Sequence, residues 1–170
     1  AELIRDSLLH LSGELDLALG GSTWSYENRK LVFNHTSEDN TNYLTNRRSI
    51  YLPVIRNNVY DLFELFDFPN PNSMSGDRTP STTPQQALYL MNSPFVQQAV
   101  VKFSRGIADS DSSIRIRRFY QSAFHRDPEV DEIGRALRFV ETFPSTSEPL
   151  DKWQAFAQSL ICSNEFLFLQ

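Results

Sequence analysis

The sequence predicts a mainly α fold: a helical bundle in the carboxyl-terminal half, a long ordered irregular segment in the amino-terminal and central part, and little β structure. From residue 83 onward, helix-start signals and apolar residues at three- and four-residue steps recur. Residues 22–47 lack such periodicity and are rich in Asn, Ser, Thr and Glu. With 170 residues and 40% hydrophobic content, the chain is long enough to bury one core, so we predict a single domain over residues 1–170.

The amino-terminal third combines short helices with strand-like stretches. A first helix is expected to end at Gly13 and has these apolar residues at helical spacing: Leu3, Ile4, Leu8 and Leu11. We expect a second, short helix over residues 14–19, ended by Gly20 and Gly21, and a strand around residues 31–33. The alternation of Ile50, Leu52 and Val54 with other residues predicts a short strand, which Pro53 confines to the edge of a sheet.

Helix-start signals mark the centre of the chain. Asn57 or Asn58 is the expected cap of a helix that stops near Pro69 and carries the apolar residues Val59, Leu62, Phe63 and Phe66. Thr83, Pro84 and Gln86 form a capping-box pattern, which predicts that a helix starts there. Ser93 and Pro94 open the next helix, whose expected buried stripe is Val96, Val100, Phe103 and Ile107.

Three more helices are predicted to complete the bundle. Ser112 or Ser113 is expected to cap the first, which buries Ile116, Phe119, Tyr120 and Ala123. Asp127 and Pro128 are expected to start the second, which forms a hairpin with the first and buries Val130, Ile133, Leu137 and Val140. The last long helix follows a loop over residues 144–149, and residues 166–169 are expected to close the core. Its expected buried residues are Leu150, Trp153, Phe156, Ala157, Leu160 and Ile161.

Charge and composition argue against several classes of function. The net charge of -5 and the pI near 5.2 argue against a nucleic-acid partner, since phosphate binding needs a basic face. Acidic residues closely flank a group of arginines, for which we expect a solvated mixed-charge face: Arg115, Arg117, Arg118 and Arg126. No apolar run is long enough for a membrane span. The histidines are far apart and the single cysteine, Cys162, lies in an apolar helix, so neither a metal site nor a cofactor is predicted.

The candidate functional residues are polar side chains in or beside the central irregular region: Arg48, Tyr51, Arg56, Asp67, Arg78, Thr82, Thr83, Gln86 and Asn92. Arginine forks and helix amino termini are suited to a carboxylate, sulfate or phosphate, so an anion or a carbohydrate is one possible ligand. The other interpretation is an internal network, in which Arg56 or Arg78 pairs with Asp67 and the remaining side chains bond to loop carbonyls. We favour the internal network, because buried polar groups in long ordered loops need partners whatever the function. No catalytic residue is predicted.

Two further groups of residues have a functional and a structural interpretation. An oxygen-rich loop could hold Ca²⁺, but its residues also favour turns, which we prefer: Asp67, Asn70, Asn72, Ser75 and Asp77. Aromatic rings in the irregular part could stack on sugars or form a protein interface, but we expect them to pack under the loops: Trp24, Tyr26, Tyr43 and Tyr51.

Short motifs in order along the chain resemble one known family. The opening residues Ile4, Arg5 and Asp6, with Ser12, Gly13 and Leu15, match the pattern IRD…SG.L, and Gly20 and Gly21 match GG. The central part fits RRS.YLP..R…FDFP and R..TT..QAL..LNSPF, through residues 48–56, 66–69, 78–88 and 92–95. Arg126, Pro128 and Glu132 match GR.P…E, and residues 163–166 match SNEF. Over almost its whole length, the chain is therefore similar to the domain of unknown function (DUF) family 1553.

The resemblance implies a context for the chain. Members of this family form the carboxyl-terminal module of multidomain proteins of the planctomycete type, often with a cytochrome-c-like domain, which implies an extracytoplasmic parent protein. Because the chain also begins within a helical pattern, we expect it to be a carboxyl-terminal fragment of a larger protein. It departs from the commonest family pattern at Gln85 and at His125, where relatives usually have glycine.

Two functions are compatible with these observations. The first is a non-catalytic structural or interaction module of an extracytoplasmic, cytochrome-linked protein, which packs its central polar region against the preceding domains of the parent chain. The second is an enzyme or carbohydrate-processing component with a polar cleft lined by Arg48, Arg56, Asp67 and Arg78. Exposed arginines and aromatic rings favour the first, and an accessible pocket with convergent polar groups favours the second.

Overall fold

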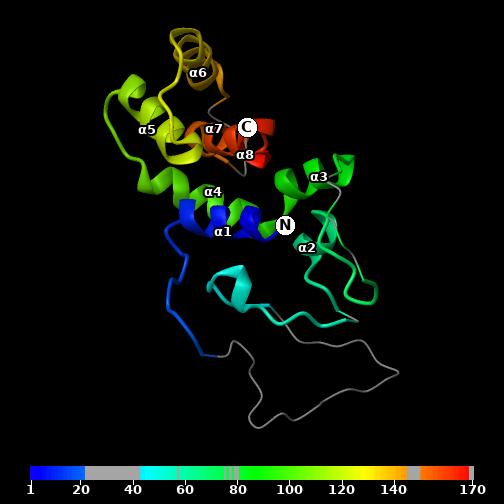
Figure 1. The fold of residues 1–170 in the computed structure, drawn as a ribbon. Coiled ribbons are helices and arrows are strands. Elements are labelled where there is room, and N and C mark those ends of the chain that lie inside the picture. Colours follow the sequence, from blue (N-terminus) through cyan, green and yellow to red (C-terminus); the bar gives the residue numbers. More distant parts are fainter. Residues whose placement is uncertain are drawn as a thin grey trace. The chain divides into compact units, whose positions relative to one another are not determined.

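Figure 1 shows a computed structural model of the chain. The structure describes residues 1–21, 43–56, 58–74, 76, 78, 81–144 and 150–168. The regular elements in these residues are α-helices and one 3-10 helix, and their only β contact is an isolated bridge between Asp16 and Arg47. The described residues are therefore mainly α-helical, which confirms the predicted fold class. The strand expected at residues 31–33 lies outside the described residues.

The chain divides into two compact units. The first contains Ala1–Leu9 and Glu14–Gln86, and the second contains His10–Gly13 and Ala87–Gln170. The single domain that we expect over residues 1–170 stays a prediction.

Helix α1 spans Glu2–Leu11 and begins the first unit. Its buried residues are Arg5, Leu8 and Leu9, whereas Leu3 is 70% exposed, so the buried face differs from the predicted apolar stripe. The backbone N–H groups of Glu14 and Leu15 donate to the Leu9 carbonyl at 2.9 and 3.1 Å, which ends the helix. Arg5, which the predicted apolar stripe does not include, is thus part of the buried face.

The short helix predicted over residues 14–19 is wrong. Asp16 donates its N–H to the Asn46 carbonyl at 2.9 Å, and its carboxylate accepts the Ala18 N–H at 2.8 Å. A helix of six residues is marginal without tertiary contacts, so bonds to a distant segment replace its internal bonds.

The edge strand predicted around residues 50–54 is also wrong. Residues Ser49–Tyr51 form the 3-10 helix η1, and Leu52 follows with the extended angles φ -72° and ψ 134°. The buried residues are Ser49, Leu52 and Ile55, whereas Ile50 and Val54 are 76% and 51% exposed. Both 3-10 and polyproline-type backbone repeat every three residues, which explains why the buried positions are three apart and not two.

Helix α2 spans Asp61–Leu65 and begins later than predicted. Its N-cap is Tyr60, whose side chain makes no capping bond; Asn57 lies outside the described residues. Leu62, Phe63 and Phe66 are buried as expected. The Phe63 ring stacks on Phe68 with their centroids 5.1 Å apart, so aromatic packing holds this short helix in the first unit.

Helix α3 spans Pro84–Asn92 and starts at the predicted capping box. The Thr83 N–H donates to Gln86 Oε1 at 3.1 Å, and the Gln86 N–H donates to Thr83 Oγ1 at 3.4 Å. This reciprocal pair satisfies two donors at the helix start and confirms the prediction.

The second unit is a helical bundle, as predicted. Its helices are α4 (Pro94–Gly106), α5 (Ser112–Phe124), α6 (Val130–Thr142), α7 (Lys152–Ile161) and α8 (Asn164–Leu167). Helix α7 packs against α4, α5, α6 and α8, and α5 also packs against α6 and α8 (Figure 1). Phe119 lies at the centre of the core, where its ring meets Phe103, Phe156 and Trp153 at centroid distances of 5.2, 5.5 and 6.0 Å.

The starts of two helices in the second unit, α5 and α6, differ from the prediction. Asp111, and not a serine, caps α5: its carboxylate accepts the N–H groups of Ser113 and Ile114 at 2.7 and 3.1 Å. A carboxylate can accept both bonds and also interacts favourably with the helix dipole, which a serine cannot do.

Helix α6 starts after Glu129 and not at Pro128, and it leaves Val130 89% exposed. At the carboxyl end, Phe168 is 39% exposed and does not close the core, and Leu169 lies outside the described residues.

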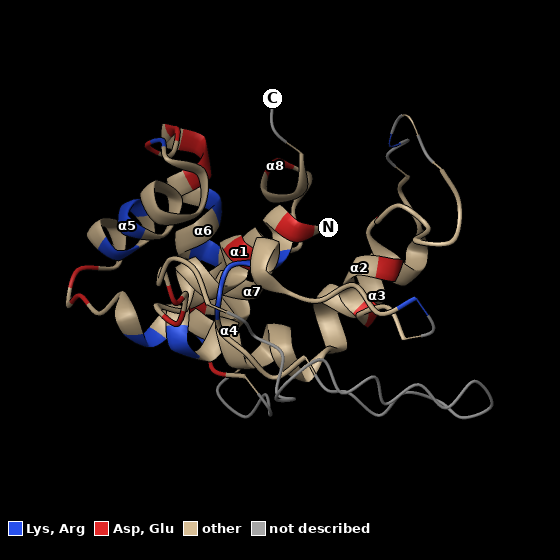
Figure 2. Cartoon of the chain, turned by 60° about the horizontal axis from the view of Figure 1, so that its bottom comes forward, with Lys and Arg blue, Asp and Glu red and all other residues tan. Residues whose placement is uncertain are grey.

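Charged residues of both signs lie on α5 and α6 of the second unit and on the turns beside them (Figure 2). On α5, Arg118 lies 3.4 Å from Asp109, and Arg115 stacks on Trp153 with its guanidinium carbon 4.3 Å from the ring centroid. The Arg118 pair agrees with the mixed-charge face expected from the sequence, whereas Arg115 is half-buried against the Trp153 ring and does not lie on a solvated face. None of the helices among the described residues has the length and apolar character of a membrane span.

Candidate functional site

Arg5 is the centre of a buried polar cluster in the first unit. Its side chain is 1% exposed, and it donates to the Arg47 carbonyl at 2.8 Å, to Ser49 Oγ at 3.3 Å and to the Thr45 carbonyl. Asp6 accepts the Ser49 N–H at 2.8 Å and the Ser49 hydroxyl at 2.6 Å. These bonds fasten residues 45–49 to α1, so the cluster serves to hold the irregular segment.

Arg47 is the centre of a second polar cluster, in which its guanidinium bonds to the backbone around two glycines. Its guanidinium donates to the carbonyls of Ala18 at 2.9 Å, Gly21 at 3.3 Å, and Gly20. It also stacks on Tyr51, 4.1 Å from the ring centroid, and the Tyr51 hydroxyl accepts the Gly20 N–H at 3.2 Å. Both glycines have positive φ, +69° and +76°, which a glycine adopts without steric cost. Tyr51, a predicted site residue, therefore supports a turn.

Three of the predicted site residues, Asp67, Thr83 and Gln86, come together at the start of α3. The Asp67 carboxylate accepts the Ser81 hydroxyl and N–H, both at 2.7 Å, and these bonds lower the pKa of Asp67. Gln86 is 5% exposed and donates to the Leu65 carbonyl at 2.9 Å and to Ser81 Oγ at 3.3 Å. The group ties the end of α2 to the start of α3.

Asp67 also has an unusual backbone conformation. Its φ is 59°, in the left-handed region, where Asp is tolerated better than most residues with a side chain. The bonds to Ser81 therefore also hold this strained position in place.

Arg78 pairs with Glu2 and not with Asp67, which corrects the pairing expected from the sequence. Two of its nitrogens lie 2.7 and 2.9 Å from the two carboxylate oxygens, the bidentate geometry of a strong arginine pair. Burial opposes ionisation of the Glu2 carboxyl, but the bonds from Arg78 outweigh this and lower the pKa of Glu2. The guanidinium also lies 5.5 Å from the centroid of the Phe68 ring.

The remaining predicted residues do not join these groups. Asn92, in the second unit, donates to the Leu88 carbonyl at 2.9 Å within its own helix, and Thr82 is exposed. Arg48 and Arg56 are exposed, and within the described part of the chain their side chains make no hydrogen bond or ion pair. The structure thus places the predicted set in separate contacts and not around one common point.

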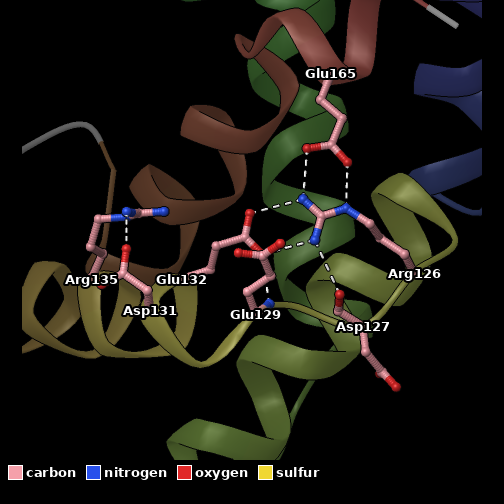
Figure 3. Close-up of polar contacts among 7 residues, drawn as sticks. All are labelled: Arg126, Asp127, Glu129, Asp131, Glu132, Arg135 and Glu165. Atoms are coloured by element: carbon pink, nitrogen blue, oxygen red, sulfur yellow. Dashed lines mark hydrogen bonds and ion pairs between the residues drawn. The ribbon is translucent and has the colours of Figure 1, made fainter. Parts of the chain in front are cut away.

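Arg126 is the centre of a charged cluster in the second unit (Figure 3). Its Nη1 and Nη2 each lie 2.8 Å from an oxygen of Glu132, and its Nε and Nη2 lie 2.6 and 2.8 Å from the oxygens of Glu165. Nη1 also donates to the Asp127 carbonyl at 3.1 Å, and the Tyr120 ring centroid is 5.3 Å away. One arginine therefore joins the turn after α5, the first turn of α6, and α8.

The electrostatics of this cluster are strongly shifted. The bonds from Arg126, helped by the Glu129 N–H at 2.7 Å, lower the pKa of Glu132 from 4.5 to about 2. The two carboxylates in turn raise the pKa of Arg126. His125, which precedes this arginine, has φ +56°, and glycine adopts this conformation most easily. The backbone at this position therefore suits a glycine, the residue that the family resemblance implies here.

Sequence reasoning identified Arg5 only as a motif residue, assigned Arg126 to a motif and to a solvated mixed-charge face, and missed Arg47. One signal was present for Arg5: it lies three and four residues before Leu8 and Leu9, on the apolar face of the helix. The partners of Arg47 and Arg126 are up to 29 and 39 residues away, and no local pattern points to them.

A metal site and a reactive thiol are the two candidate chemistries that the described residues allow us to check. The described residues contain no group of three His, Cys, Asp or Glu side chains arranged to hold a metal ion. Burial raises the pKa of the Cys162 thiol, which disfavours the nucleophilic thiolate. In the oxygen-rich loop, Asn70 Oδ1 accepts the Asn72 N–H at 2.9 Å, a turn contact as expected, and Ser75 and Asp77 lie outside the described residues.

The aromatic rings of the first unit serve packing where they are described. The Tyr43 ring lies 5.1 Å from that of Tyr60, and its hydroxyl donates to the Asn58 carbonyl. Trp24 and Tyr26 lie outside the described residues.

Comparison with known proteins gives one match. A search of curated proteins and a search of solved structures returned no significant similarity. The family model PSD1, described as a protein of unknown function (DUF1553), matches residues 1–140. This match covers the clusters around Arg5, Arg47, Asp67 and Arg78 and, in the second unit, Arg126 and Glu132. The chain therefore belongs to the PSD1 family (DUF1553), whose function is unknown.

Proposed function

We propose that this chain is a non-catalytic interaction module of a larger, extracytoplasmic, cytochrome-linked protein. Its contact surface is the exposed side of the segment that follows the Arg5 cluster, made of Arg48, Ile50, Val54 and Arg56, which we name the basic strip. The partner is a preceding domain of the parent chain. The extracytoplasmic and cytochrome-linked context rests on the family resemblance, and the choice of surface rests on exposure and charge.

Exposure of the basic strip is the observation that carries the proposal. Ser49, Leu52 and Ile55 face the interior of the first unit, so the backbone of this segment is fixed from one side. Ile50 and Val54 remain 76% and 51% exposed on the other side. A pre-ordered segment with exposed aliphatic groups binds at a lower entropic cost than a flexible one.

The charges of the strip indicate the chemistry of the partner. Arg48 and Arg56 flank the aliphatic pair, and both are exposed without a carboxylate partner in the described part of the chain. Arginine is enriched in protein interfaces, because its stem covers apolar surface and its fork binds carboxylates. The complementary surface therefore has an apolar centre with carboxylates at its ends.

The alternative, an enzyme or carbohydrate-processing component, has less support. It requires Arg48, Arg56, Asp67 and Arg78 to line one cleft, but Asp67 bonds to Ser81 and Arg78 bonds to Glu2. Polar groups that already have partners inside the fold lose those bonds when they bind a ligand. An anion or a carbohydrate on Arg48 or Arg56 is the remaining form of this alternative.

Binding between this chain and the preceding part of the parent protein, produced as two polypeptides, tests the proposal. We expect measurable affinity by calorimetry and at least about a tenfold loss for the pair of substitutions Arg48→Glu and Arg56→Glu, since each arginine then repels a carboxylate. Arg117→Glu is the control, because Arg117 is also exposed but lies on α5. Absence of binding, or an equal loss with the control, would contradict the proposal.

A second arm tests the alternative. The thermal stability of the parent chain is measured with sulfate, phosphate and neutral oligosaccharides, because a ligand that prefers the native state raises it. A rise that the two strip substitutions remove would favour a small-ligand site over a protein interface.

A further inference from the structure

We draw no further inference here: the strongest candidate, the exposed apolar side of helix α3 formed by Ala87, Leu88 and Met91, carries none, because nothing in the structure shows what covers it.

Discussion

Replacement of Arg126 by methionine tests whether the charged cluster of the second unit holds α8. Methionine keeps the length and the apolar contact with Tyr120 and Phe124 but removes all bonds to Glu132 and Glu165. The variant leaves two carboxylates without their shared cation. We expect the second unit to lose stability and α8 to lose its attachment to the turn after α5.

The expected magnitude follows from the pKa of Glu132. A shift from 4.5 to about 2 corresponds to about 3 kcal/mol at 1.36 kcal/mol per unit. Arg126 and Glu165 are each 35% exposed, so solvent screening reduces this figure. We therefore expect Arg126→Met to lower the free energy of unfolding by about 1.5–2 kcal/mol at pH 7.

The dependence on pH has a definite sign. The folded state holds the pKa of Glu132 below its unfolded value, so the stabilisation is fully present above pH 4.5 and is lost as the pH falls toward about 2. The difference in unfolding free energy between parent and Arg126→Met should therefore shrink between pH 4.5 and about 2.

Urea unfolding followed by the fluorescence of Trp153 is the measurement. Trp153 lies in the core of the second unit, and a Trp24→Phe background removes the other tryptophan. Arg135→Met is the matched control, because Arg135 pairs with Asp131 on the surface of α6, where a pair contributes little. A loss below about 0.5 kcal/mol, or a difference that stays constant down to pH 2, would refute the reasoning.

Three further substitutions test individual contacts by urea or thermal unfolding. Arg5→Met is expected to cost about 3–4 kcal/mol, because it removes the buried donor to the Thr45 and Arg47 carbonyls, and a loss under about 1 kcal/mol would contradict this role. Gln86→Ala is expected to cost about 2 kcal/mol through its bonds to Leu65 and Ser81, whereas the exposed neighbour Gln85→Ala should be nearly neutral; equal costs would contradict the assignment. His125→Gly is expected to raise stability by up to about 1 kcal/mol by relieving the positive φ, and a decrease would show that the strain is not significant.

The starts of α3 and α4 were predictable because a cap is a local device. Thr83 and Gln86 are three residues apart, and their two bonds form whenever the helix starts at Pro84. Where several capping residues stand together, as around Asp111, the sequence alone does not decide among them; the carboxylate takes the position because it accepts two N–H groups at once.

The irregular first unit was less predictable because long-range bonds determine it. Arg5 and Ser49 are 44 residues apart, and Arg78 and Glu2 are 76 residues apart. No local pattern specifies such pairs, so the pairing of Arg78 with Asp67 was wrong, and the helix at residues 14–19 was replaced by contacts with residues 46–47. The alternating pattern in the segment Ser49–Ile55 wrongly predicted a strand for the same reason. The bonds of Ser49 to Asp6 determine which residues of this segment face the interior.

The motifs of the family therefore describe the fold more than a ligand site. Arg5, Asp6 and Ser49 bond to one another, and Arg126 bonds to both Glu132 and Glu165, although each set comes from separate motifs. Motif residues that are far apart in the sequence meet as hydrogen-bonded partners. Arg48 and Arg56 are motif residues that have no such partner within the described residues.

Arg48→Ala and Arg56→Ala separate folding from function most directly. Both side chains are exposed, so we expect each substitution to change the free energy of unfolding by less than about 0.5 kcal/mol. Arg78→Ala, which breaks a bidentate pair with Glu2, should cost about 1 kcal/mol after allowance for its exposure. If the strip binds a partner domain, the first two variants should lose affinity while keeping their stability. Losses of stability above about 1 kcal/mol for Arg48→Ala and Arg56→Ala would instead mean that these arginines serve the fold, and the proposed interface would have no remaining basis.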